Sequence, residues 1–230
     1  RRYQEDMKRT LERQENLDLK QAMVTKLCLT DGHVSAVVTR LGAVYSVRAC
    51  VIASGTYLDA RVIIGDSAVS SGPDGMQAAI GLTDCLREMG LRLRRFKTGT
   101  PPRINRRSID FSKMELQPGD ETVEPFSFRT AHKVNNSAVC YLTYTNEETH
   151  RIIRENLSRS PIYDGTISGV GPRYCPSIET KIVRFPEKTR HQLFIEPCGL
   201  NTEEMYIQGF SSSMPEDVQL RMLRTIPGLE

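Results

Sequence analysis

The sequence predicts a mixed α/β fold, because helical and strand-like apolar patterns both occur along its 230 residues. Near the N-terminus, apolar residues recur every four positions among charged ones, which is typical of an amphipathic helix with one buried stripe: Tyr3, Met7 and Leu11. That helix is predicted to end near Glu15. Short β-prone runs follow it, and the composition, 39% hydrophobic and 26% charged, is that of a globular chain.

The β-prone runs occupy residues 17–29, 33–40 and 43–53, with an Asp-Gly pair between the first two that predicts a hairpin turn. The third run begins with alternation and finishes continuously apolar, as a strand does when it enters a sheet covered on both faces. It stops just before Gly55, where glycine allows a ligand to approach the end of a strand closely. Residues 62–75 show little periodicity, and we expect a loop there.

Apolar stripes and capping signals predict three further helices. They cover residues 76–89, closed by Gly90, residues 146–157, with Thr145 opening a capping box, and a segment that starts at Ser213 and ends before Pro227. Strands are expected at residues 193–195 and 205–207. From residue 91 onward the composition shifts toward β-prone runs and proline-containing loops, so we place a domain boundary near residues 90–93.

Charge and cysteine content exclude several classes of protein. The longest apolar runs are too short to cross a bilayer, and no signal peptide precedes the first helix, so no membrane association is expected. A formal net charge of +3 means that any affinity for nucleic acid must come from local clusters. Six cysteines without a C-x-x-C pair indicate a reducing compartment, and four scattered histidines predict no metal site. The chain begins with Arg1 rather than Met, which suggests a fragment.

The stretch of residues 169–181 carries the sharpest chemical signal. Pro176 suits the first position of a helix, which would put Cys175 at the helix N-terminus. Unpaired N–H groups there stabilise a thiolate, and Arg173 could add a positive charge, so Cys175 is a candidate nucleophile. The same helix end and its glycine-rich lead-in would suit a phosphate. The alternative, that Cys175 is a small buried hydrophobe beside a structural turn, stays open.

A second signal is a local cluster of basic residues in which Glu88 is the one acidic side chain. Its members are Arg87, Arg92, Arg94, Arg95, Lys97, Arg103, Arg106 and Arg107. Such a cluster could contact the phosphates of a nucleic acid, and Phe96 within it could stack on an unpaired base. The alternative is a solvated face whose charges have acidic partners elsewhere in the fold.

Several motifs in order along the chain resemble the MnmG family, also called GidA, over essentially the whole chain. They are Lys97–Arg103, Ser108–Ser112, Pro125–Phe128, Cys140–Thr143, Thr145-Asn146, Gly171–Glu179 and Glu196-Pro197. The resemblance implies a partial doubly wound FAD/NAD-linked reductase-like domain with an inserted, mixed β-rich domain for substrate and NAD. Residues 1–90 would be the remnant of the FAD-binding domain, and residues 91–230 the inserted domain.

The function that the resemblance implies is modification of the tRNA wobble uridine at C5, by addition of an aminomethyl or carboxymethylaminomethyl group. The family uses FAD and NADH, takes a one-carbon unit from a folate, and works with the GTPase MnmE. A homodimer of the full-length protein and a cytoplasmic location are implied as well. Two alternatives remain: a non-catalytic module that binds tRNA, NADH or the partner, and a folate- and FAD-dependent tRNA methyltransferase like TrmFO.

The resemblance also implies roles for individual residues. Cys175 matches a catalytic cysteine of the family. The basic residues that would bind tRNA are Arg94, Arg95, Lys97 and Arg103. The NAD stretch supplies Gly171, Pro172, Arg173, Tyr174, Pro176, Ser177, Ile178, Glu179, Lys181, Arg184 and Phe185. The positions that match flavin contacts are Met23, Gly55 and Ala79.

Overall fold

The computed structural model describes residues 2–169, 171–172 and 175–230. The chain forms two compact units, one made of Arg1–Val62 and Val69–Leu93 and the other of Ile63–Ala68 and Arg94–Glu230. Helices and antiparallel β-sheets both occur, which confirms the mixed α/β class. The assignment of residues 1–90 to a FAD-binding domain and of residues 91–230 to an inserted domain stays a prediction.

The first unit opens with helix α1, Arg2–Glu12, as its apolar spacing predicts, although the helix ends before Glu15. The stripe itself is not buried: Tyr3 is 77% exposed, Met7 40% and Leu11 43%. Periodicity decides which residues share one face of a helix, whereas burial requires a second element to cover that face. The prediction of a buried stripe is therefore wrong.

Strands β1 (Val24–Thr30), β2 (His33–Thr39) and β3 (Val44–Ser46) form an antiparallel sheet in that order. The predicted hairpin turn is confirmed, since Asp31 and Gly32 both have positive φ, 50° and 78°. The third run, however, forms a strand only as far as Ser46, and beyond it Val51 is 90% exposed. The Val47 N–H still donates to the Ser35 carbonyl of β2 at 3.0 Å, but in the part of the chain that the structure describes no strand pairs with residues 48–53, so the apolar run has no sheet to enter.

Helix α2 spans Leu82–Glu88, so it begins later than the predicted residue 76, and Gly90 follows it with φ +87° as expected. Its buried face packs against Leu27 of β1, and the Leu27 N–H donates to Cys85 Sγ at 3.3 Å. The predicted loop at 62–75 contains a hairpin instead, β4 (Arg61–Ile64) and β5 (Ser67–Ser70). Short 3₁₀ turns complete the chain at Pro73–Gly75, Arg106–Ser108, Phe111–Lys113 and Leu157–Arg159.

The second unit is built on an antiparallel sheet with the order β6-β10-β9-β8-β7. Its strands are β6 (Arg103–Asn105), β7 (Glu115–Gln117), β8 (Cys140–Tyr144), β9 (Gln192–Pro197) and β10 (Glu204–Gln208). The two strands predicted at 193–195 and 205–207 are confirmed as β9 and β10. They lie next to each other within the sheet, and each buries two apolar side chains: Leu193 and Ile195 in β9, and Met205 and Ile207 in β10.

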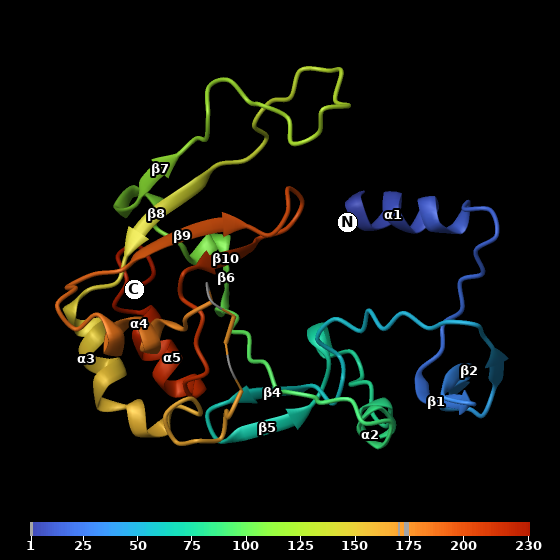
Figure 1. Cartoon of the computed structure of the whole chain (residues 1–230). Helices are drawn as coiled ribbons and strands as arrows, with labels where there is room; N and C mark the ends of the chain where they lie inside the picture. Colours follow the sequence, from blue (N-terminus) through green and yellow to red (C-terminus); the bar gives the residue numbers. More distant parts are fainter. Residues whose placement is uncertain (1, 170, 173–174) are drawn as a thin grey trace. The chain divides into compact units, whose positions relative to one another are not determined.

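Three helices gather on one side of this sheet: α3 (Glu147–Glu155), α4 (Ile178–Arg184) and α5 (Glu216–Leu223) (Figure 1). Together with β9 and β10 they enclose the core of the unit. Its fully buried members include Ile153, Ile178, Ile182, Leu193, Ile195, Ile207, Phe210, Met214 and Met222. At about 25 cal/mol per Å² of apolar surface, this core is the main favourable contribution to the unit's stability.

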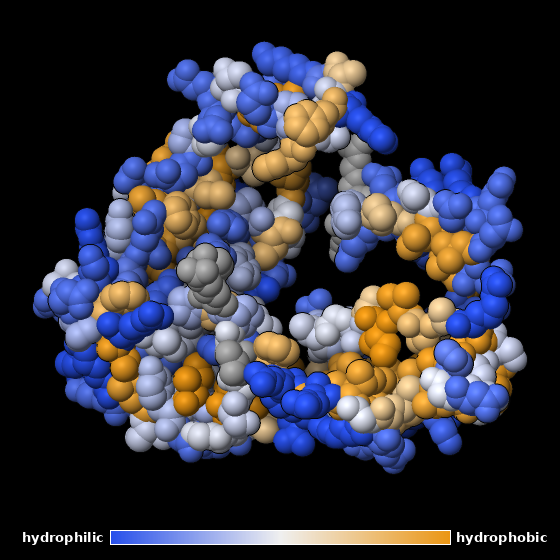
Figure 2. All heavy atoms as spheres, viewed as in Figure 1, coloured by the Kyte–Doolittle hydropathy of each residue, from blue (hydrophilic) through white to orange (hydrophobic). Residues whose placement is uncertain are grey.

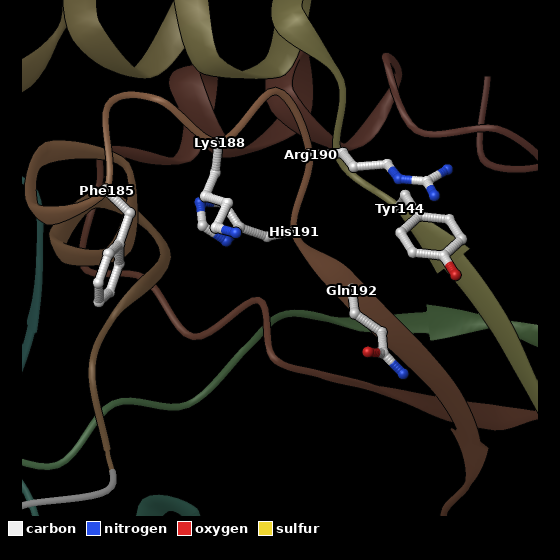
Figure 3. Close-up of a pocket in the computed structure, with 6 residues that line it drawn as sticks. All are labelled: Tyr144, Phe185, Lys188, Arg190, His191 and Gln192. Carbon is white, nitrogen blue, oxygen red and sulfur yellow. The ribbon is translucent and has the colours of Figure 1, made fainter.

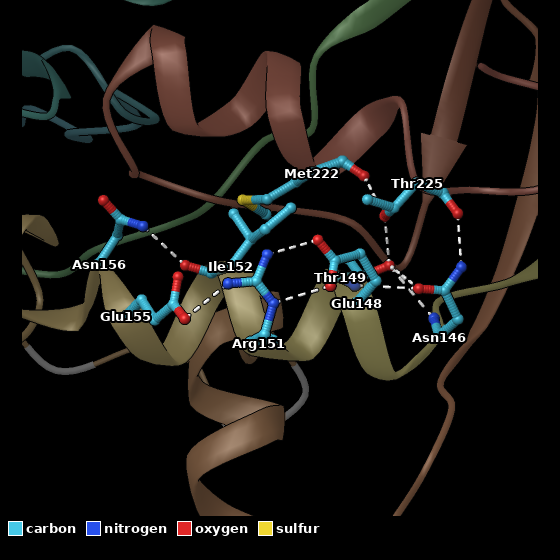
Figure 4. A network of polar contacts seen from close by, with 9 residues as sticks. All are labelled: Asn146, Glu148, Thr149, Arg151, Ile152, Glu155, Asn156, Met222 and Thr225. Atoms are coloured by element: carbon cyan, nitrogen blue, oxygen red, sulfur yellow. Dashed lines mark hydrogen bonds and ion pairs between the residues drawn. The ribbon is translucent and has the colours of Figure 1, made fainter.

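Helix α3 begins with a capping box, one residue later than predicted. Asn146, not Thr145, is the N-cap: its side chain accepts from the Thr149 N–H, and the Thr149 hydroxyl accepts from the Asn146 N–H. The same two side chains bind Thr225 after α5, which ties α3 to that helix (Figure 4). Thr145 cannot cap, because it is buried at the end of β8 with its hydroxyl bonded to His150.

The surface carries apolar side chains among polar ones (Figure 2). The most exposed large ones are Leu41, Val51, Phe126 and Phe128. Among the described residues, no helix is both long and apolar enough to cross a membrane.

His150 of α3 is a buried histidine next to a second one. Its Nε2 lies 2.8 Å from Thr145 Oγ1, and its ring centroid lies 5.3 Å from that of His191. Burial lowers the pKa of His150 to about 4, and the charges of His191 and Arg154 act in the same direction. His150 is therefore neutral at neutral pH in the folded chain.

We expect His150 to make the protein less stable in mild acid. An unfolded histidine binds a proton near pH 6.5, whereas folded His150 does so only near pH 4, so protons bind preferentially to the unfolded chain between these values. The contribution of neutral His150 is complete above about pH 6.5 and is lost as the pH falls toward about 4. Urea denaturation followed by circular dichroism across this window should show a shallower pH dependence for His150→Asn. The exposed His33→Asn is the control, and an unchanged slope in His150→Asn would contradict the assignment.

Candidate functional site

Cys175 is half-buried and lies before helix α4, not in its first turn. The N-cap of the helix is Ser177, whose hydroxyl accepts from the Thr180 N–H at 3.3 Å. Pro176 therefore precedes the cap and is not the first helical residue, so that prediction is wrong. The serine decides the boundary, because a capping hydroxyl fixes the helix start more strongly than a proline that is merely tolerated there.

The thiol of Cys175 lies against a loop that is distant in sequence. Its Sγ is 3.8 Å from Thr98 Oγ1, and its N–H donates to the Pro172 carbonyl at 3.1 Å. Gly171 packs on the stem of Lys97, where an added Cβ would fall 2.8 Å from the lysine Cε. Only glycine fits this approach without displacing the lysine. The structure thus brings Lys97, predicted as a tRNA contact, beside the predicted dinucleotide stretch.

Lys181 is the described cation that acts on Cys175. Burial lowers the pKa of Lys181, while the charge of Cys175 acts in the opposite direction and raises it. The ammonium of Lys181 therefore lies close enough to Cys175 for their charges to interact. The ammonium is held in place by the Gly209 carbonyl, to which Nζ donates at 3.1 Å.

From the sequence, Arg173 is predicted to be the cation near Cys175, and Lys181 is predicted only as a dinucleotide contact. Arg173 and Tyr174 lie outside the described residues. Lys181 could have been found from the helix register, because it stands four residues after the cap Ser177 and so on the same face of α4.

The first turn of helix α4 hydrogen-bonds to the segment that follows β10. The Ile178 N–H donates to the Ser211 carbonyl at 2.7 Å. The Glu179 carboxylate accepts from the Ser213 N–H at 3.1 Å and from its hydroxyl at 3.3 Å. Ser213 is therefore bound to Glu179. The sequence predicts it as the start of α5, but Pro215 occupies the N-cap position of that helix.

Several members of the predicted dinucleotide stretch have structural positions. Ile178 and Glu179 are fully buried, and neither side chain reaches solvent in this structure. Pro172 and Pro176 are exposed, and Arg184 lies over the ring of Phe185 at 5.7 Å, on the surface. The assignment of the stretch to NAD stays a prediction.

Arg103 of the basic cluster is engaged by its own chain. Arg103 donates to Thr100 Oγ1 at 2.6 Å and to the Pro101 carbonyl at 2.7 Å. It also lies 4.6 Å from the ring of Tyr206 and 3.6 Å from Glu204. The solvated-face alternative thus describes Arg103 well, since its own chain already holds the guanidinium.

Arg94 and Arg95 are exposed at the start of the second unit, and Lys97 is half-buried. The backbone of Gly169 runs against the Arg95 carbonyl, with an added Cβ 3.2 Å from the oxygen. These cations therefore lie on the loop that contacts the Cys175 segment, and they can serve a substrate that reaches the thiol.

Met23, Gly55 and Ala79 belong to segments that come together in the first unit. The Ala79 N–H donates to the Tyr57 carbonyl at 2.8 Å, two residues after Gly55. An added Cβ on Gly81 would lie 3.5 Å from Thr25, two residues after Met23. The assignment of these three positions to flavin contacts stays a prediction. Among the described residues, no group of three or more histidine, cysteine or acidic side chains could hold a metal ion.

Comparison with known proteins identifies relatives of this chain. A family model described as glucose inhibited division protein A matches residues 1–230. A Clostridium botulinum protein named tRNA uridine 5-carboxymethylaminomethyl modification enzyme MnmG is 56% identical over 230 residues, which are 100% of this chain and 37% of the relative. Its Bacillus licheniformis namesake is 54% identical over 228 residues, 99% of this chain and 36% of that protein.

A solved structure is similar over the same extent. The chain superposes on GidA of Aquifex aeolicus, form I crystal, with a TM-score of 0.91 and 47% identity, covering 99% of this chain and 39% of that one. The chain therefore spans less than two-fifths of the length of the curated relatives and the solved structure that it matches.

We expect Lys181→Met to slow alkylation of Cys175 by iodoacetamide near neutral pH, because the change removes a cation whose charge interacts with Cys175 while keeping the side-chain volume. A loss of about 1 kcal/mol of charge interaction corresponds to a rate about fivefold lower. The rate at Cys175 is read by peptide mass spectrometry. Lys188→Met is the matched control, and an equal rate in wild type and Lys181→Met would exclude the ammonium from the site.

Proposed function

The chain belongs to the glucose inhibited division protein A family, and from this premise we propose that it forms part of an enzyme that modifies C5 of the wobble uridine in tRNA. The observation that carries the proposal is the 56% identity, along the entire chain, to a protein named as that enzyme. Because this chain spans 37% of that relative, we propose the complete activity for a protein of the relative's full length and not for this chain alone.

Cys175 is the proposed nucleophile. C5 of a uracil ring becomes reactive when a thiolate adds to C6: the S–C6 bond forms, and the C5–C6 π electrons move into an enolate. C5 then bonds to the incoming carbon, and loss of its proton with expulsion of the thiolate restores the ring. Lys181 lies close enough for its charge to interact with Cys175, and the Thr98 hydroxyl lies where it can contact the sulfur.

The proposal includes the cofactors of the reaction, with FAD and NADH supplying the electrons and a folate supplying the carbon when bound. We assign NADH to residues 171–185 and FAD to the segments of Met23, Gly55 and Ala79. The close packing of Gly171 on Lys97 supports the first assignment, since a basic side chain held on a glycine backbone can bind a phosphate. The three segments of the first unit supply only part of a flavin site.

The proposed partners are the tRNA, the GTPase MnmE and a second copy of the full-length protein, in the cytoplasm. For the tRNA, the proposed contacts are the exposed Arg94 and Arg95 and the half-buried Lys97, on the loop that contacts the Cys175 segment. The bases of an anticodon loop are unpaired and can be turned outward into a protein site. A uridine turned outward in this way could reach a thiol that lies on a loop.

Cys175→Ser is expected to abolish the modification. Because the chain covers 37% of the C. botulinum relative, the test replaces the corresponding segment of that protein with this chain. The chimera is expressed in a strain that lacks the modification, and tRNA nucleosides are analysed by mass spectrometry. The wild-type chimera sets the baseline, and Cys198→Ser, at an exposed cysteine, is the matched control. Normal modification by the Cys175→Ser chimera would remove the thiol from the mechanism.

The triple change of Arg94, Arg95 and Lys97 to Ala should weaken tRNA binding by the same chimera and flatten its salt dependence. Each lost phosphate contact reduces the slope of log K against log salt by about 0.7 to 0.9. Filter binding over a range of salt concentrations measures it. The control removes three cations in and just after α1: Lys8, Arg9 and Arg13. A slope equal to that of wild type would place these three residues outside the interface.

A further inference from the structure

A surface hollow of about 390 Å³ lies in the second unit, apart from the residues assigned to catalysis. It is formed where β8 ends and β9 begins, together with the turn that follows α4. Its lining residues are Tyr144, Phe185, Lys188, Arg190, His191 and Gln192 (Figure 3). Of these residues, Phe185 alone also belongs to the predicted dinucleotide stretch, residues 171–185.

The lining of this hollow is cationic. Lys188 and Arg190 carry full charges, and the described lining contains no carboxylate. A neighbouring hollow of about 450 Å³ shares Tyr144 and Arg190 but is lined by Glu147 as well. The first hollow has two cations and no carboxylate, whereas the second has one of each, so the first one favours an anion.

Aromatic rings accompany the cations on both sides of the hollow. The Arg190 guanidinium lies 4.2 Å from the ring centroid of Tyr144, and Figure 3 shows the two side by side, with Phe185 at the opposite side of Lys188 and His191. The Phe185 ring is 42% exposed. A guanidinium held over a ring keeps its remaining N–H groups in one plane, which suits the oxygens of a phosphate.

His191 supplies an unsatisfied polar atom in the same wall. Its Nε2 is buried and has no hydrogen-bond partner among the described residues. Burial lowers the pKa of His191, the charges of Lys181 and Lys188 act in the same direction, and Glu187 opposes them. The ring is thus neutral at neutral pH, with one N–H to donate. Buried polar groups without a protein partner are expected to meet water or a ligand.

We propose that this hollow binds the phosphate group of a nucleotide. Arg190 and Lys188 hold the oxygens, Gln192 and His191 offer neutral donors, and the nucleotide's planar ring lies against Tyr144 or Phe185. The phosphate could belong to a mononucleotide unit or to an RNA strand, which share this chemistry. The site makes no use of Cys175 and shares Phe185 with the residues assigned to NADH, while its cations Lys188 and Arg190 lie outside that stretch.

Isothermal titration of the 230-residue chain tests the site with four probes: AMP, adenosine, inorganic phosphate and a short oligouridylate. We expect AMP or the oligouridylate to bind at least about tenfold more tightly than adenosine, because a charge-assisted hydrogen bond to phosphate supplies that much. Binding by AMP assigns the site to mononucleotide units, and binding by the oligouridylate alone assigns it to RNA. Both should exceed inorganic phosphate, which lacks the ring.

Arg190→Gln is expected to weaken the bound probe about tenfold, and Lys188→Gln is a second variant that leaves the Tyr144 contact intact. Arg221→Gln, at an exposed arginine of α5, is the matched control, with circular dichroism to verify folding. Equal binding of AMP and adenosine, no binding of either phosphate-bearing nucleotide, or unchanged affinity in both variants would overturn the proposal. Cys175→Ser should bind normally, so a failure of the proposed chemistry is distinguishable from a failure of this site.

Discussion

The segment Gly209–Ser213, which follows β10, is the joint on which the arrangement of the second unit depends. Gly209 has φ +97°, and an added Cβ would fall 2.9 Å from the Gln192 carbonyl oxygen, so only glycine permits the turn. Phe210 is fully buried and anchors the segment in the core. The polar contacts of the segment are Lys181 Nζ to Gly209 O, Ile178 N to Ser211 O, Ser212 N to Thr100 O, Ser213 N to Glu179 Oε1 and Gly65 N to Ser213 O.

This joint explains why a cysteine, a threonine and a lysine from distant parts of the sequence can act together. It binds helix α4 on one side and the loop that ends at Thr100 on the other, and that loop carries Thr98. Lys181 is held by the joint itself. The thiol is therefore placed by backbone contacts of its neighbours, and the half-buried ammonium of Lys181 interacts with it electrostatically. An exposed cation would be screened by water and salt, whereas a partly buried one acts more strongly.

The sequence predicted those features that depend on neighbouring residues. The Asp31-Gly32 turn, α3, β9 and β10 follow from local spacing and turn chemistry, and all are present. Burial of α1 and entry of residues 48–53 into a sheet were wrong, because both depend on elements elsewhere in the fold. The same reason separates the site residues. Cys175 stood out by its local context, but its contact with Thr98 and its coupling to Lys181 arise only when the Gly209–Ser213 segment joins their elements. The resemblance to a family supplied the function, which neither spacing nor charge could have named.

Hydrogen–deuterium exchange of Glu179→Met tests the joint most directly. Methionine keeps the buried volume but accepts no hydrogen bond from Ser213. We expect faster exchange of the backbone amide hydrogens both in α4 and in residues 97–100. The amides of β8, β9 and β10 should stay as protected as in the wild type. Faster exchange confined to α4, or none at all, would contradict the claim that the Gly209–Ser213 segment connects the two halves of the site.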